Sequence, residues 1–548
     1  MLPRHERVPT VGLLLAALGV VARGVEASQQ VRLFNDAPRF IAAAQALAGG
    51  DWRVAVADAF HPLTALFMAA TAHALRVDLE FAGQLVSVAA GGVGTFATWR
   101  LARAIYGDRV ALAAALVFAL HPRLVASSAG VQSDGLYLAL FVLATGAAWR
   151  ALAEDRLGSA GLAGLLCGLA YLTRPEGLVV AVALGLWILG RALRTPRKAL
   201  RAAALGACFA AFLGAVGAPY VVALHDVTGS WSLTRKKTLW LEVRSAPPAC
   251  IRSIADASRG EHLATARATP PGVLASTTGR EATSLGASEH RGFAQTDGIR
   301  RVALEPRRAP PRAASPPDGR PKDPAVAGAV ELIVDFVRAL HGVVLALCLL
   351  GVGRARAPAG AKFLLTLCGV IAVMLGALYA EAGYVSRRHW LPAVALLMPF
   401  AGRGGLRLLD AVVAWAPPLA RWPHARRALV AACVLVLLGD AAVPSEDAQK
   451  RARREAAQWL RDRAEAPVVA SHRARDAYYA GASRYVPLAG TLPGDRSSLA
   501  SARAAGAVYA LVDVGAGDPL SLPAEWAREL FRAEHRGRAV VVVEIAPP

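Results

Sequence analysis

The chain has 548 residues, of which 55% are hydrophobic and only 18% are charged. This balance excludes a water-soluble protein of ordinary composition, because so much apolar surface needs lipid around it. The formal charge of +21 would suit nucleic acid. However, most of the excess is arginine at the ends of apolar runs, as cytoplasmic loops of membrane proteins require, so nucleic acid is not expected as a partner.

Apolar runs recur along the chain between short charged stretches, and this pattern predicts repeated membrane crossings. We expect a polytopic α-helical membrane protein with about eleven transmembrane helices. Residues 61–75 are apolar but too few to cross about 30 Å of hydrocarbon as a helix, so we place them in the outer leaflet. The predicted spans cover residues 8–27, 81–104, 110–128, 134–150, a short fifth span that ends at Arg174, 178–190, 202–224, 327–351, 363–381, 389–402 and 428–443.

Lysine and arginine near the span ends predict the orientation, because short cytoplasmic loops collect these charges. The densest basic run, at residues 191–201, is therefore expected inside. This places the N-terminus in the cytoplasm and the first loop, residues 28–60, on the outer face. We expect an integral protein of a bacterial inner membrane.

The composition divides the chain into four parts. Residues 1–225 form an N-terminal transmembrane module with the candidate catalytic residues, and residues 327–443 form the remaining transmembrane helices. Between them, residues 226–326 are rich in Pro, Arg, Ser and Thr and predict a long, largely disordered outer loop. Residues 444–548 combine helical stretches with short β-like runs, so they predict a small soluble α/β domain on the outer face.

Two acids on the predicted outer face are candidate catalytic residues. Asp36 lies in the first outer loop, where a carboxylate can remove a proton from an acceptor hydroxyl. Asp134 opens the fourth span on the same side. It suits the role of a second acid, beside Asp36 as the base, that binds a metal or the acceptor. The alternative for both is that they cap helices, and Asp36 stands two residues before Pro38, a residue typical of a helix start. The sequence leaves the two readings equally open.

Several cations on the same face break the rule that short outer loops lack positive charge. A lipid phosphate or pyrophosphate would explain them, because the forked guanidinium group binds phosphate well. The alternative is that these side chains only reach toward lipid headgroups. The candidates are Arg387 and Arg388 before the tenth span, Arg174 after the fifth, and Lys236 after the seventh.

In order and spacing, these residues resemble the GT-C fold glycosyltransferases that use polyprenyl-phosphate sugars, which include protein O-mannosyltransferases and the aminoarabinose transferases of lipid A. The resemblance covers residues 8–225 and 327–443. It rests on Asp36 with Phe40, Ala44 and Gly50-Asp51-Trp52, on His61-Pro62, on Tyr106-Gly107 followed by Pro122 and Ser133-Asp134, on the Leu172-Thr173-Arg174-Pro175-Glu176-Gly177 motif, and on residues 386–392.

The resemblance implies an inverting transfer in which Asp36 activates the acceptor hydroxyl. Arg387 and Arg388 would then offset the charge on the leaving phosphate, with Arg174 and Lys236 as further candidates. Asp58 and His61, at the end of the first loop, would serve as acceptor or accessory residues. The chain departs from many relatives at two places, Asn35-Asp36-Ala37 instead of an acidic pair and Pro62-Leu63 instead of a double proline. A divalent metal is therefore possible but not implied.

The expected function is transfer of a sugar from a polyprenyl-phosphate donor to a lipid, glycan or protein acceptor, in contact with membrane lipids. One alternative is a secondary transporter, which would carry its charges in mid-span between repeated halves. The candidate residues instead cluster at the outer ends of spans. Another alternative is a non-catalytic glycan-assembly protein whose C-terminal domain recruits partners.

Overall fold

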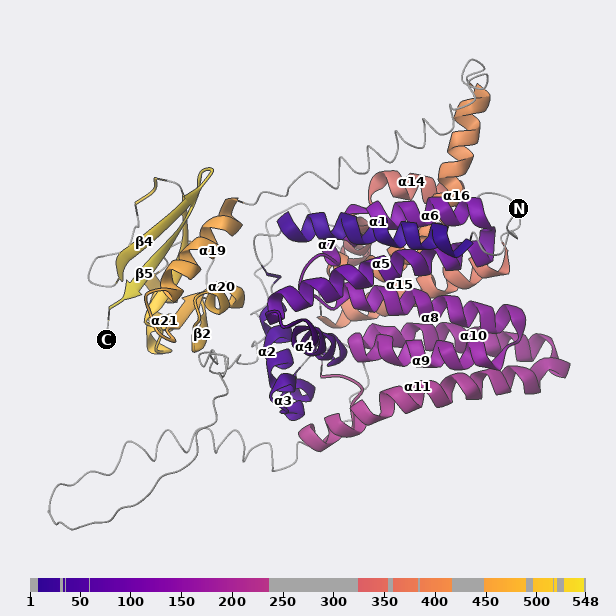
Figure 1. Cartoon of the computed structure of the whole chain (residues 1–548), viewed down its shortest axis with the longest axis horizontal. Coiled ribbons are helices and arrows are strands. Elements are labelled where there is room, and N and C mark those ends of the chain that lie inside the picture. Colours follow the sequence, from indigo (N-terminus) through magenta and orange to yellow (C-terminus); the bar gives the residue numbers. More distant parts are fainter. Residues whose placement is uncertain are drawn as a thin grey trace, which may run out of the picture.

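The computed structural model describes residues 8–29, 33–34, 36–58, 60–235, 324–352, 358–382, 385–415, 448–488, 496–515, 517–519 and 527–546. Within these ranges, a bundle of apolar helices carries an α/β domain at one end (Figure 1). Three sequence predictions fall outside the described residues: the eleventh span at 428–443, Lys236, and residues 236–323 of the long loop.

The N-terminal half of the bundle contains a helix for each of the first seven predicted spans. The short helices α2, α3 and α4 make up the first loop and its continuation, at the end of the bundle that faces the α/β domain (Figure 1). In chain order the elements are α1 (Val8–Gln29), α2 (Ala37–Ala48), α3 (Trp52–Ala57), α4 (Leu63–Leu75), α5 (Leu79–Tyr106), α6 (Asp108–Leu120), α7 (Pro122–Ser127), α8 (Asp134–Glu154), α9 (Leu157–Thr173), η1 (Pro175–Leu178), α10 (Val179–Arg194), η2 (Pro196–Lys198) and α11 (Ala199–Thr228).

The later helices match the predicted spans eight to ten. They are α13 (Pro324–Leu340), α14 (Gly342–Val352), α15 (Ala359–Ala382), the short η3 (Arg387–Trp390) and α16 (Leu391–Trp415). Among the described residues, six helices are long and apolar enough to cross a membrane, or seven if the pair α13 and α14 counts as one span. The segments 63–75 and 157–173 are shorter apolar helices.

Two predicted spans are broken in the structure. The predicted span 110–128 ends as α6 at Leu120, because Pro122 disfavours helical backbone at His121 and starts the separate helix α7. The predicted span 327–351 consists of two helices that meet at 93°. The break lies at His341, whose positive φ of 67° ends α13.

Close helix packing in the second half depends on small residues. A Cβ atom on Gly404 would lie 1.8 Å from the carbonyl oxygen of Leu347, and one on Gly351 would lie 1.9 Å from that of Phe400. The backbones of α14 and α16 therefore touch directly, as small residues allow between membrane helices. This contact fixes α16, and with it the η3 turn that begins it.

The C-terminal domain is a five-stranded sheet with helices, which confirms the predicted α/β class. The strand order is β2-β1-β3-β5-β4, with parallel pairing of β1 to β2 and β3 and antiparallel pairing from β3 to β5 and β4. The edge strands β2 and β4 carry charged side chains and lack a long apolar run. The elements are α19 (Ala448–Arg461), β1 (Val468–Ser471), α20 (Ala474–Tyr479), β2 (Arg484–Pro487), α21 (Arg496–Ala504), β3 (Tyr509–Gly515), β4 (Ala527–His535) and β5 (Arg538–Ile545).

The C-terminal domain packs directly on the first loop of the bundle. One buried apolar cluster combines Phe40 and Ile41 of α2 and Met68 of α4 with residues of α19, α20 and the sheet. The backbone of Leu33 is held on both sides: its N–H donates to the Tyr479 hydroxyl at 2.7 Å, and its carbonyl accepts from Arg475 at 3.2 Å. The domain thus fixes the chain three residues before Asp36.

The interior of the C-terminal domain contains a buried ion pair. Arg453 of α19 is 1% exposed and donates to the carboxylates of Asp476 and Asp513. Burial alone would lower the pKa of this guanidinium, but the two carboxylates raise it above its ordinary value. Arg453 is therefore charged, and it joins α19 to α20 and β3.

Replacing Arg453 with alanine should destabilise the C-terminal domain by about 3–5 kcal/mol, because the buried carboxylate of Asp476 would lose its nearest counter-charge. Thermal unfolding and limited proteolysis of the detergent-solubilised protein would measure this loss. The control is Arg528→Ala, which removes an exposed pair with Glu544 at 3.1 Å and should cost only about 0–1 kcal/mol. Equal losses in the two variants would contradict the buried role of Arg453.

Candidate active site

A small polar pocket lies where the first loop, the start of α8, the α9–η1 turn and η3 meet. Its cavity volume is about 20 Å³, room for one or two water molecules. Five of the sequence candidates line it. The lining residues are Asp36, Phe40, Phe60, His61, Gln132, Ser133, Asp134, Thr173, Arg174, Pro175 and Arg388.

Asp36 occupies the N-cap position of α2, but its side chain makes no capping hydrogen bond. Instead, its Oδ2 accepts from the Arg388 guanidinium at 2.7 Å. The Asp36 side chain is about 29% exposed and lines the pocket while the arginine holds its Oδ2. Of the two interpretations left open by the sequence, this geometry favours a carboxylate that belongs to a charged site.

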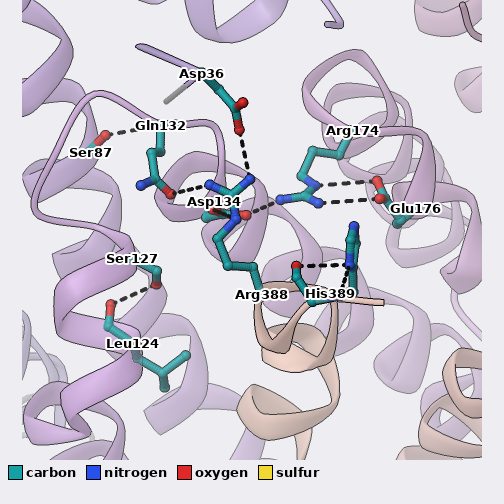
Figure 2. A network of polar contacts seen from close by, with 11 residues as sticks. Asp36, Ser87, Leu124, Ser127, Gln132, Asp134, Arg174, Glu176, Arg388 and His389 are labelled. Atoms are coloured by element: carbon teal, nitrogen blue, oxygen red, sulfur yellow. Dashed lines mark hydrogen bonds and ion pairs between the residues drawn. The ribbon is translucent and has the colours of Figure 1, made fainter. Parts of the chain in front are cut away.

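Asp134 is the first residue of α8 and is 2% exposed. Its Oδ1 accepts a hydrogen bond from Arg174, and its Oδ2 lies 3.9 Å from Nε of Arg388. The carboxylate therefore bridges two guanidinium groups, as Figure 2 shows. A buried carboxylate needs such partners, because an unpaired charge would be strongly destabilising there.

The Leu172-to-Gly177 motif builds the turn that holds Arg174. The residue before a proline favours extended backbone, and Arg174 adopts it, with φ −153° and ψ 138°. Pro175 then starts η1, which places Glu176 where both of its oxygens accept from the Arg174 guanidinium at 3.3 Å. Arg174 is 6% exposed and is fully committed to Asp134 and Glu176. Arg174 therefore holds the Asp134 carboxylate in place.

Gly177 allows this turn to fold back on α9. A Cβ atom at this position would lie 2.5 Å from the backbone nitrogen of Tyr171 and 2.6 Å from the carbonyl carbon of Ala170. Both obstacles are backbone atoms, which cannot rotate away. Glycine is thus required for the close contact between η1 and α9.

Arg388 is the centre of the network, and Figure 2 shows its guanidinium between Asp36, Gln132 and Asp134. It also donates to Oε1 of Gln132 at 3.4 Å. Burial lowers the pKa of Arg388, but the carboxylates of Asp134 and Asp36 outweigh this and raise the pKa above its ordinary value. The side chain is about 42% exposed. Arg388 therefore stays charged and keeps one open side, unlike Arg174.

The remaining sequence candidates take different positions. Arg387 points to another partner, Asp335 of α13, at 3.3 Å and does not line the pocket. Asp58 also lies outside the lining, but it pairs with Arg39 at 2.9 Å and accepts from the backbone N–H of Phe60, which does line it. Lys236 lies outside the described residues.

His61 lines the pocket and is 2% exposed. Its Nδ1 lies 2.5 Å from the carbonyl oxygen of Tyr171. Because a carbonyl only accepts hydrogen bonds, Nδ1 carries the proton. The ring also packs against the rings of Tyr171 and Tyr220, at 5.0 Å and 4.9 Å between centroids. His61 thus ties the start of α4 to the end of α9.

Two residues of the network were not among the sequence candidates. Glu176 was visible in the motif, and an acid two residues after an arginine could have suggested a pair. Gln132 gave no signal, because an uncharged amide is common on protein surfaces and its burial depends on the loop between α7 and α8. Two hydrogen bonds from other helices hold this loop in place: the Ser87 hydroxyl donates to the backbone oxygen of Gln132 at 3.3 Å, and Arg23 donates to the Ser128 hydroxyl at 2.6 Å.

The carboxylates of this site do not fit a divalent metal. Hard cations need several oxygen ligands that are free to coordinate. Here Asp36 and Asp134 each accept from a guanidinium, and no group of three or more His, Cys, Asp or Glu side chains placed to share a metal occurs in the described part of the chain. A guanidinium supplies the positive charge between the two acids.

Gly177→Ala should disturb the Arg174 turn and lower the melting temperature of the purified protein by several degrees, because the new methyl group meets backbone. The matched control is Gly185→Ala in α10, where a Cβ atom would meet nothing within 4 Å. That change should be neutral or slightly stabilising, since alanine favours helix. A melting temperature for Gly177→Ala equal to that of the control would contradict the assigned close contact.

The comparisons with known proteins agree with this architecture. Residues 60–216 match the family model described as dolichyl-phosphate-mannose-protein mannosyltransferase. This segment includes His61, Asp134 and the Arg174 turn. Comparison with curated proteins finds no match.

Two solved structures share the fold over most of the chain. ArnT from Cupriavidus metallidurans, bound to undecaprenyl phosphate, has 13% identity and a TM-score of 0.51 and covers 96% of this chain and 97% of its own. The archaeal oligosaccharyltransferase AglB from Archaeoglobus fulgidus, in complex with an inhibitory peptide and a dolichol-phosphate, has 13% identity, a TM-score of 0.53 and coverages of 92% and 69%. The protein is thus an integral membrane protein that shares the GT-C fold of these two structures over most of its length, and its residues 60–216 match the mannosyltransferase family model.

Proposed function

We propose that this protein transfers a sugar from a polyprenyl-phosphate donor to a hydroxyl group of a lipid, glycan or protein acceptor on the outer face of the membrane. The observation that carries the proposal is the contact between Asp36 and Arg388 at the mouth of a polar pocket. A general base and a phosphate-binding cation must both lie near the anomeric carbon, on opposite sides of it, because the bond that forms and the bond that breaks share that carbon.

In the proposed reaction, the acceptor oxygen attacks the anomeric carbon of the sugar from the face opposite the phosphate. A bond forms between the acceptor oxygen and the anomeric carbon while the bond from that carbon to the phosphate oxygen breaks. The configuration at the anomeric carbon is therefore inverted. The acceptor proton passes to Asp36 and then to water. The electron pair of the broken bond stays on the polyprenyl phosphate, whose growing charge the Arg388 guanidinium stabilises.

The donor must open the site before this can occur. The cavity of about 20 Å³ is much smaller than a sugar ring. Arg388 is the charged lining residue with the largest exposed fraction, and its contacts to Asp36 and Gln132 are individual hydrogen bonds that a phosphate can replace. We infer that the phosphate draws Arg388 away from Asp36, which both widens the pocket and frees the base.

Arg174 would act indirectly. Its guanidinium pairs with both Glu176 and Asp134, so it fixes the position of the Asp134 carboxylate. Asp134 in turn lies 3.9 Å from Arg388 and helps to hold that arginine in place. Arg387, paired with Asp335, would help to fix η3 relative to α13. His61 and Asp58 would shape the first loop, and Asp58 does so through Phe60.

The distribution of positive charge supports the proposed outer location of the site. The connection from α10 to α11, which includes Arg194, Arg197 and Lys198, lies at the end of the bundle opposite to α2, α3 and the C-terminal domain (Figure 1). Basic ends of this kind remain on the cytoplasmic side. The pocket, the first loop and the C-terminal domain would then lie outside, where a lipid-linked sugar and its acceptor meet.

Asp36→Asn should lower the rate of sugar transfer about 10²- to 10⁴-fold, because the amide cannot take the acceptor proton. The assay follows label transfer from a pool of polyprenyl-phosphate sugars by purified protein in native membrane lipid. Asp51→Asn is the control, since Asp51 caps α3 through the backbone N–H of Val54 and asparagine caps equally well. Full activity of Asp36→Asn would remove Asp36 from the mechanism.

The orientation can be tested with single cysteines in a background without the native thiols. Ala48, at the end of α2, and Thr195, between α10 and η2, are both exposed. A membrane-impermeant maleimide should label Ala48→Cys in intact cells and Thr195→Cys only after permeabilisation. The reverse pattern would place the pocket in the cytoplasm and contradict the proposed function.

A further inference from the structure

Gln132 is a buried polar residue in the pocket that the proposed mechanism does not yet use. It is 2% exposed and follows α7 in the loop that leads to Asp134. Its backbone oxygen is held by Ser87, so the residue has a fixed place. Its side-chain Nε2 is buried and has no hydrogen-bond partner among the described residues.

The orientation of this amide is determined by Arg388. A guanidinium only donates hydrogen bonds, so the atom that faces it must be the carbonyl oxygen Oε1, at 3.4 Å. The NH₂ group then points to the opposite side, as Figure 2 shows. An amide flip would place two donors against each other and is therefore excluded.

A buried donor without a partner is costly, by an amount comparable to a lost hydrogen bond. Gln132 lines the pocket together with Ser133, Asp36 and the aromatic side chains Phe40 and Phe60. A hydrogen-bond donor and aromatic rings in the lining of one pocket suit a sugar, which has hydroxyl oxygens at its rim and C–H groups on its faces. The phosphate of the same ligand would bind at the Arg388 end of the amide.

We infer that Nε2 of Gln132 donates a hydrogen bond to a hydroxyl oxygen of the sugar while that sugar is being transferred, so that Gln132 contributes to the choice of donor. This inference rests on the proposed function. It assigns recognition of the phosphate to Arg388 and recognition of the sugar to the adjacent amide. A site built to hydrogen-bond a hydroxyl discriminates strongly against a ligand that lacks it.

Two substitutions remove the donor and have opposite effects on Arg388. Gln132→Glu keeps an oxygen toward Arg388 and adds a negative charge, whereas Gln132→Met is of similar size and leaves Arg388 without that acceptor. The measured quantity is the ratio of two affinities, that for the sugar donor used by the wild type and that for undecaprenyl phosphate, which has no sugar. Effects that act only through Arg388 change both affinities in the same direction, so the ratio reports mainly on contacts to the sugar.

Both variants should lower this ratio about 10- to 100-fold, the effect expected for one lost hydrogen bond to a buried group. The control is Ser87→Ala, which loosens the backbone of Gln132 but keeps its amide, and it should leave the ratio unchanged. When the sugar donor lacks the recognised hydroxyl, the ratio of its affinity to that for undecaprenyl phosphate should be the same in the wild type and in Gln132→Met.

An unchanged ratio in either Gln132 variant would overturn the inference, and so would an equal fall in Ser87→Ala, which would assign the effect to loop geometry. These results leave the proposed function intact, because it is judged by transfer in the wild type. If the wild type transfers sugar from no donor in the pool, the proposed function fails and the role of Gln132 fails with it.

Discussion

The site depends on one guanidinium group that is shared between two carboxylates. Arg388 binds Asp36 at 2.7 Å across 352 positions of sequence and lies 3.9 Å from Asp134. These contacts join the first loop, the start of α8 and the turn before α16. Each acid would be unfavourable near a membrane surface without a counter-charge, and Arg388 would be unfavourable without the acids. The three charges thus hold three distant segments together.

The surrounding structure makes this arrangement rigid on one side and open on the other. Glu176 and the Gly177 turn hold Arg174 against Asp134, and the C-terminal domain holds Leu33 through Tyr479 and Arg475. Arg388, by contrast, keeps an exposed side. In our proposal this asymmetry is functional, because the donor phosphate must displace the arginine while Asp134 and the first loop stay in place.

The sequence predicted the fold class, and it grouped its candidate residues on one face, because both inferences use local information. Apolar runs determine helix positions, and arginines at span ends determine which acids share a face. The sequence could not predict which acid each arginine pairs with, because Arg174 and Arg388 both appear as cations near span ends. In the structure Arg174 is enclosed by Asp134 and Glu176, whereas Arg388 is partly exposed. Only the fold of the α9–η1 turn distinguishes them.

Two further differences have identifiable physical causes. The bend at His341 was hidden because hydropathy averages over α13, although Glu331 and Asp335 interrupt the apolar pattern there. The role of Gln132 was hidden because an uncharged amide becomes informative only once its burial and its lack of a partner are known. Tertiary structure decides both features, so a single sequence does not contain a direct signal for them.

The central claim is that a lipid phosphate and Asp36 compete for the same guanidinium. The most direct test is to measure the affinity of purified protein for undecaprenyl phosphate in the wild type, Asp36→Asn and Arg388→Ala. The account predicts that Arg388→Ala binds at least about tenfold more weakly, because a charge-assisted contact is lost. It also predicts that Asp36→Asn binds more tightly, because the competing carboxylate is gone. Equal affinity in the wild type and Arg388→Ala, or weaker binding by Asp36→Asn, would contradict it.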